Sequence, residues 1–110
     1  MHALLGAGAT VDQARNDGVT PLIVASNKGH LDVVRALLGA GAAVDQADNI
    51  GATPLLIACY QGQLAVVKVL LGKGAFPNVK DGDGDTPLST ASAGGHREIV
   101  ELLRAHGATK

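Results

Sequence analysis

Residues 16–22 read Asn-Asp-Gly-Val-Thr-Pro-Leu, and the triplet Thr20-Pro21-Leu22 within them predicts the start of a helix. A threonine hydroxyl at the N-cap can accept a backbone N–H that has no partner inside the helix. Proline suits the next position, because its missing N–H would have had no partner there. The four residues before the triplet favour a turn. The stretch therefore predicts a turn that leads at once into a helix.

The residues that follow predict two short helices joined by a tight turn. The first is expected to run from Pro21 to about Lys28, because Gly29 can adopt the left-handed conformation that closes a helix. The second is expected to begin near Leu31 and to end at Gly39. Its apolar residues recur at helical spacing and form one face: Val33, Val34, Leu37 and Leu38. Two helices of this length are marginal alone, so they gain stability only by stacking on the next pair.

This unit repeats along the chain with a period of 33 residues. The Thr-Pro-Leu triplet occurs at 20–22, 53–55 and 86–88, and residues 15–47 match residues 48–80 at 15 of 33 aligned positions. Other residues keep the same spacing: Gly18, Gly51 and Gly84; Gly29, Gly62 and Gly95; Ala25, Ala58 and Ala91; Leu4, Leu37, Leu70 and Leu103; Gly8, Gly41, Gly74 and Gly107. A period of this size is typical of a solenoid, in which each unit stacks on its neighbour.

The repeat divides the chain into two complete units at 15–47 and 48–80, a partial unit at 1–14 and a C-terminal unit at 81–110. Residues 1–14 match only the second helix and loop of a unit. We therefore expect either a fragment of a longer array or an engineered start at Met1. The C-terminal unit is expected to be a cap, because solenoid ends need polar outer faces. Four polar residues there replace apolar ones: Ser89, Thr90, Arg97 and Arg104.

The combined pattern of Gly-x-Thr-Pro-Leu, a later Ala and Gly-His, then Val-Val, Leu-Leu and Gly-x-Gly-Ala resembles the ankyrin repeat family over essentially the whole chain. The resemblance implies an all-α solenoid of stacked helix-turn-helix units with β-turn fingers. The family usually has histidine after Thr-Pro-Leu, where this chain has Ile23, Leu56 and Ser89. We expect burial of the two apolar side chains to replace that histidine's hydrogen bond between repeats. The usual loop, Ala-Asp-Val-Asn, is also altered at 43–45 and 76–78.

Composition excludes several classes of function. Nine Lys and Arg against ten Asp and Glu give a net charge of −1, which argues against duplex DNA as a partner. Tyr60 and Phe76 are the only aromatic residues, too few for a platform on which nucleic-acid bases stack. No apolar run is long enough for a transmembrane helix, and the first residues lack the pattern of a signal peptide. One cysteine allows no internal disulfide. We expect an intracellular, cytoplasmic protein that binds neither nucleic acid nor membrane.

The sequence predicts neither catalysis nor a cofactor. His30 and His96 occupy the Gly-His position of the repeat, and no pair of histidines has zinc-ligand spacing. Residues 81–85 read Asp-Gly-Asp-Gly-Asp, like the start of a calcium loop, but the sixth and twelfth positions hold threonine and serine where such a loop needs glycine and glutamate. They also align with the turn of the repeat, so a solvated turn is the favoured interpretation. Cys59 is expected to be a buried packing residue, because the equivalent positions hold Ser26 and Ser92.

The resemblance implies a binding surface on the concave face, where the turn fingers and first helices of successive units align. Carried over position by position, the partner-binding residues would be Asn16, Asp17, Val19, Asn27, Lys28, Asn49, Ile50, Ala52, Tyr60, Gln61, Asp83 and Asp85. At these positions the repeats also differ most from one another, as free surface positions do. Tyr60 is expected to be the central contact, with Ile50 beside it and the aspartates at the rim, since tyrosine is a frequent interface anchor. The alternative is that Tyr60 is simply an exposed ring.

The predicted function is therefore a non-catalytic module that binds a protein partner of unknown identity. A second hypothesis is a structural, self-associating spacer, in which the exposed half-repeat at residues 1–9 pairs with another copy through Leu4 and Leu5. A third, an enzyme or metal protein, would need a convergent cluster of reactive side chains that the sequence does not display.

Overall fold

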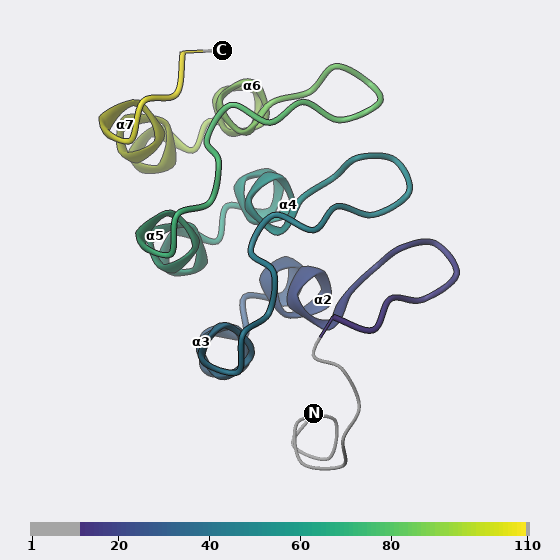
Figure 1. The fold of residues 1–110 in the computed structure, drawn as a ribbon. Coiled ribbons are helices and arrows are strands. Elements are labelled where there is room, and N and C mark those ends of the chain that lie inside the picture. The colour runs from purple at the N-terminus through teal and green to yellow at the C-terminus, as the bar shows by residue number, and fades with distance from the viewer. Residues whose placement is uncertain (1–11, 110) are drawn as a thin grey trace.

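The computed structural model describes residues 12–109, which form three successive pairs of helices and no strand. The pairs are α2 (Pro21–Lys28) with α3 (Leu31–Gly39), α4 (Pro54–Gln61) with α5 (Leu64–Gly72), and α6 (Pro87–Ala93) with α7 (Arg97–Ala105). Figure 1 shows α2, α4 and α6 stacked in one column and α3, α5 and α7 in a second, with an extended loop before each helix of the first column. The predicted all-α solenoid of stacked helix-turn-helix units is confirmed.

Each helix of the first column begins as the Thr-Pro-Leu triplet predicts. The hydroxyl oxygens of Thr20 and Thr53 accept the backbone N–H of the residue three positions later, at 3.2 Å in both cases. Gly29 closes α2 with a left-handed φ of 72°. The third unit differs, because Thr86 and Ser89 exchange hydrogen bonds in a capping box and α6 ends one residue earlier, at Ala93.

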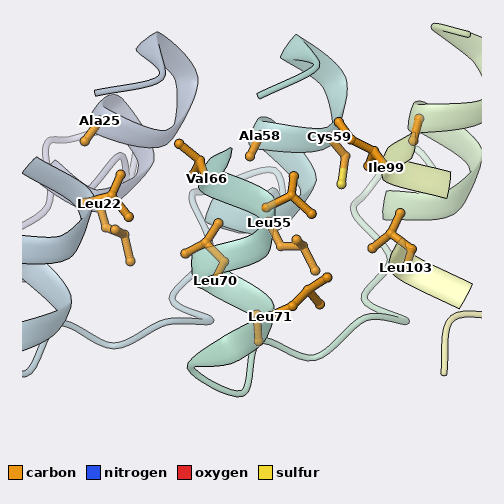
Figure 2. Close-up of a cluster of buried hydrophobic side chains, with 14 of the residues drawn as sticks. Leu22, Ala25, Leu55, Ala58, Cys59, Val66, Leu70, Leu71, Ile99 and Leu103 are labelled. Atoms are coloured by element: carbon orange, nitrogen blue, oxygen red, sulfur yellow. The ribbon is translucent and has the colours of Figure 1, made fainter. Parts of the chain in front are cut away.

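A single apolar core runs through all three pairs of helices (Figure 2). Five of the leucines that recur every 33 residues are fully buried in it: Leu22 and Leu55 in the first column, and Leu37, Leu70 and Leu103 in the second. Ile23 and Leu56 are 4% and 3% exposed, which confirms that apolar burial occupies the position where histidine was expected. Because each helix pair buries its apolar faces against its neighbours, the short helices depend on stacking for their stability.

Polar side chains tie each loop to the next one along the stack, again at intervals of 33 residues. Asp12 accepts the N–H of Ala43 at 2.9 Å, and Asn78 accepts the N–H of Thr109 at 2.9 Å. Between them, Asp45 accepts the N–H of the residue 31 positions later. These hydrogen bonds occupy the altered loops noted in the sequence, so both Asp and Asn serve as the acceptor.

Cys59, on α4, is fully buried on the side that faces the last helix pair (Figure 2). This confirms the expectation that it is a packing residue. Burial raises the pKa of its thiol to about 12. The equivalent Ser26 is also fully buried, and its hydroxyl has no hydrogen-bond partner among residues 12–109. Ser92, on the last helix of the first column, is exposed. A small side chain is therefore required at positions 26 and 59, where the next helix pair packs against the first-column helix.

The two ends of the array stand differently with respect to the sequence predictions. The half-repeat expected at residues 1–14, with Leu4 and Leu5, lies almost entirely outside the described residues. At the other end, Ser89, Arg97 and Arg104 are exposed and Thr90 is partly exposed, as a polar cap requires.

Candidate protein-binding surface

Three turns project from the helix stack, at residues 15–19, 48–52 and 81–85, and we refer to them as the fingers (Figure 1). An aspartate organises each of the last two. Oδ1 of Asp48 accepts the N–H groups of Ile50 and Ala52 at 3.0 and 2.9 Å. Oδ1 of Asp81 does the same within the third finger, at 2.9 Å for each bond. Such carboxylate-to-backbone bonds hold a turn in one shape without any neighbouring element.

The first finger reaches a similar shape by a different route, because Arg15 stands where the others have aspartate. Here the carboxylate of Asp17 accepts the N–H of Val19 at 3.1 Å and forms an ion pair with Arg15 at 2.6 Å. The Val19 N–H, and to a smaller extent Arg15, lower the pKa of Asp17. The turn-organising role of Asp48 and Asp81 was not predicted, although the shared Asp-x-x-Gly spacing at 48–51 and 81–84 is a visible signal.

Hydrogen bonds also fix each finger to the next. The backbone N–H of Asn49 donates to the carbonyl of Asp17 at 3.0 Å, and its side-chain amide donates to the carbonyl of Asn16 at 2.9 Å. The N–H of Gly82 donates to the carbonyl of Ile50 at 2.7 Å. The three fingers therefore form one connected row, beside the exposed sides of α2, α4 and α6. We call this surface the finger face.

Most of the residues predicted to bind a partner are exposed on the finger face. Ile50 and Tyr60 are the most prominent, at 60% and 66% exposed. Val19 is partly exposed, and Ala52 is only 2% exposed, so its side chain cannot reach a partner and we remove it from the candidate surface. The remaining exposed set is Asn16, Asp17, Asn27, Lys28, Asn49, Gln61, Asp83 and Asp85. The N–H of Ala52 bonds to Asp48 within the second finger.

Two hollows lie on this face, and they use the same repeat positions of the first and third units. One, the α2 hollow, has a volume of about 320 Å³ and is lined by Arg15, Val19, Ile23, Val24, Asn27, Lys28, Asp48 and Ile57. The other, the α6 hollow, has a volume of about 480 Å³ and is lined by Tyr60, Asp85, Ser89, Thr90, Ala93 and Gly94. Both are open surface depressions. They contain five of the predicted contact residues. Ser89 and Thr90, which line the α6 hollow, were not predicted to belong to the surface.

The aspartates of the third finger are close to one another. Single carboxylate oxygens of Asp81, Asp83 and Asp85 lie within 4.8 Å of one another, and the part of the chain that the structure describes has no other group of three such metal-ligating residues. Oδ1 of Asp81 is already engaged by two N–H groups of its own finger. The residues that resemble the start of a calcium loop thus form the turn of the third finger.

Between residues 12 and 109, no helix is long and apolar enough to cross a membrane. Comparison with protein-family models gives two matches. A model described as ankyrin repeats (3 copies) matches residues 1–81, and a model described as ankyrin repeat matches residues 83–109. No curated protein matches the chain.

Proposed function

The chain belongs to the ankyrin repeat family, whose members are in general protein–protein interaction modules and not typically enzymes. On that premise we propose that this chain is a non-catalytic module that binds a protein partner on the finger face. Its four units are those at 1–14, 15–47, 48–80 and 81–110, as the sequence predicts. We propose that it functions inside the cell, in the cytoplasm, where its one thiol would stay reduced.

The exposed ring of Tyr60 is the observation on which the proposal depends most. Tyrosine is enriched among the few residues that carry most of the binding energy of an interface. Tyr60 lies at the end of α4, in the middle unit, and is 66% exposed. Ile50, from the finger of the same unit, adds a second large apolar side chain. A partner that covers both side chains would remove their apolar surface from contact with water, which favours binding.

The rigidity of the finger row supports the same proposal. Hydrogen bonds of 2.7 to 3.0 Å connect each finger to the next. A surface that is already ordered loses little conformational entropy when a partner docks, so more of the contact energy appears as affinity. The buried Cys59, with a pKa of about 12, is unsuited to act as a nucleophile, which supports a non-catalytic role.

The test is affinity capture with the chain as bait, followed by a binding titration with the captured protein. We expect Tyr60→Ala to weaken binding about 30-fold or more, the usual scale for an interface anchor. Phe76→Ala is the matched control, because Phe76 is a similarly exposed aromatic residue in the loop after α5, away from the finger face. Unchanged affinity for both Tyr60→Ala and Ile50→Ser would contradict the proposed surface.

Light scattering over a concentration series tests the self-association hypothesis, whose residues Leu4 and Leu5 lie outside the described part of the chain. A dimer that forms with rising concentration and is lost in a Leu4→Ser/Leu5→Ser variant would support self-association. A monomer at every concentration argues against it.

A further inference from the structure

The α6 hollow is lined by hydrogen-bond acceptors and an aromatic ring, with no cationic side chain among its lining residues. Tyr60 provides the ring, Asp85 a carboxylate, and Ser89 and Thr90 hydroxyl groups. Ala93 and Gly94 have little or no side chain, so they leave the hollow open. This combination is suited to a cation that carries hydrogen-bond donors.

The two hydroxyl groups have already committed their protons to the backbone. Oγ1 of Thr90 lies 3.0 Å from the carbonyl oxygens of Thr86 and Pro87 and donates to them. Oγ of Ser89 donates to the Thr86 carbonyl at 3.1 Å and accepts the Thr86 N–H at 2.9 Å. Each hydroxyl therefore has only acceptor lone pairs left to offer, and a ligand must supply the donors.

A hydrogen bond fixes the backbone of Asp85, whereas its exposed carboxylate has no partner within residues 12–109. The Asp85 N–H donates to Asp81 Oδ1 at 2.9 Å, which fixes this end of the finger. Within residues 12–109 the side chain of Asp85 makes no hydrogen bond, and the ion pair of that region joins Arg15 to Asp17. The neighbouring carboxylates of Asp81 and Asp83 add to the negative potential beside the hollow.

The α2 hollow shows that this character is specific to the third unit. At matching repeat positions, Val19 stands where the α6 hollow has Asp85, and Lys28 stands where it has Gly94. Arg15 and Asp48 also line the α2 hollow, and Arg15 is paired with Asp17, so the α2 hollow is of mixed charge. The α6 hollow is lined by Asp85 and by no cationic residue, so a cationic side chain is better suited to the α6 hollow than to the α2 hollow.

We propose that the α6 hollow binds an arginine side chain of the protein partner, an inference that rests on the proposed function. A planar guanidinium group can stack on the ring of Tyr60 while its N–H groups donate to the carboxylate of Asp85. The hydroxyl oxygens of Ser89 and Thr90 are available to accept further donors. A partner segment that reaches this hollow from the finger row would thus present arginine at its α6 end.

The proposal is tested by NMR titration of the intact, ¹⁵N-labelled chain with the peptide acetyl-Gly-Arg-Gly-amide in the presence of a calcium chelator. Counterpart peptides carry citrulline, the neutral isostere of arginine, or lysine or glutamate. We expect the arginine peptide to shift the amide signals of residues 85–94 and to bind about three- to tenfold more tightly than the citrulline peptide, as a cation–π contact and an exposed ion pair together allow. The lysine peptide should fall between the two, and the glutamate peptide should not bind.

Two variants test the assigned groups. Asp85→Asn and Tyr60→Leu should each weaken binding of the arginine peptide about threefold, and added salt should reduce the effect of the aspartate. Asp32→Asn is the matched control, because Asp32 is an exposed acid on α3, in the other column of helices. It should leave binding unchanged.

The inference is overturned if arginine and citrulline peptides bind equally, or if the shifts centre on another part of the chain. It is also overturned if no peptide shifts these signals, whereas calcium alone shifts them in a separate titration without the chelator. Any of these results leaves the proposed function standing, because that function is tested separately, by the effect of Tyr60→Ala and Ile50→Ser on an intact protein partner.

Discussion

The carboxylate of Asp45 accepts the backbone N–H of Phe76 through both of its oxygens, at 3.1 and 3.3 Å. The bond joins the loop after α3 to the loop after α5, so it connects two successive units outside their apolar core. We expect Asp45→Ala to lower the free energy of unfolding by about 1 kcal/mol, the usual net value of such a hydrogen bond.

Urea denaturation followed by circular dichroism measures this loss. Asp45→Asn is the control, since Asn78 shows that an amide can accept the equivalent N–H. The loss of unfolding free energy in Asp45→Asn should be no more than half of the loss in Asp45→Ala. If both variants are as stable as the original chain, the bond does not contribute to holding the units together.

A pair of glycines on the middle helix pair should respond oppositely to substitution by alanine. Gly62 ends α4 with a left-handed φ of 71°, and an added Cβ would lie 2.6 Å from the ring of His96. Gly62→Ala should therefore cost about 1–2 kcal/mol, from backbone strain. Gly72 is the last residue of α5, and an added Cβ would meet nothing within 4 Å.

Gly72→Ala should raise the free energy of unfolding, by up to about 1 kcal/mol, because alanine has the higher helix propensity. Thermal melts of the two variants against the original chain provide the measurement. Equal changes in melting temperature would contradict the assigned backbone conformations.

In the described part of the chain the buried hydroxyl of Ser26 has no hydrogen-bond partner, whereas the equivalent residue of the next unit is a cysteine. Ser26→Ala removes an unsatisfied polar group from the core and should stabilise the chain by about 1 kcal/mol. Cys59→Ser introduces such a group and should cost about 1–3 kcal/mol. The urea midpoints of the two variants, compared with that of the original chain, measure these opposite changes in stability. Destabilisation by Ser26→Ala would show that the hydroxyl does have a partner in solution.

The buried thiol of Cys59 should make stability depend on pH under alkaline conditions. Burial raises the pKa of Cys59 in the folded chain to about 12 from an ordinary value of 9.0. Above about pH 9 the unfolded chain releases this proton, whereas the folded chain retains it. The contribution of the thiol to the free energy of unfolding is therefore complete below pH 9 and decreases as the pH rises above 9. The expected slope is about 1.4 kcal/mol per pH unit.

Other groups titrate in the same range, so the measurement is the difference in unfolding free energy between the original chain and Cys59→Ala at several pH values from 8 to 11. The difference should shift in favour of the alanine variant as the pH rises. In the same pH range the folded chain should react with a thiol reagent far more slowly than the unfolded chain. A pH-independent difference would mean that the thiol ionises equally in both states.

Local sequence signals predicted the helices because each signal acts on residues close to it. Thr20 caps α2 and Gly29 closes it within ten residues, and the apolar spacing from Val33 to Leu38 marks the buried side of α3. The 33-residue period then extended the interpretation to the rest of the chain. Tyr60 and Ile50 could be predicted as exposed because their repeat positions vary among the units.

What the sequence did not predict depends on contacts between units or on small differences in how a side chain lies. Ala52 holds a variable position, yet its N–H bonds to Asp48 and the residue is buried. The α6 hollow forms only because Tyr60 of the second unit and Asp85 of the third come together in space. Because the two residues belong to different units, no pattern within a single unit indicates that they lie close together.

The spacing of the loop hydrogen bonds has a consequence for the length of the array. Acceptors at residues 12, 45 and 78 reach donors at residues 43, 76 and 109, so every joint spans 31 residues. Residues 48–80 carry one donor and one acceptor of this kind, at Phe76 and Asn78. A duplicated copy of that segment, inserted after residue 80, would meet matching partners on both sides. The protein can thus be lengthened by one unit at a time, and each addition would extend the finger row without requiring a new kind of joint.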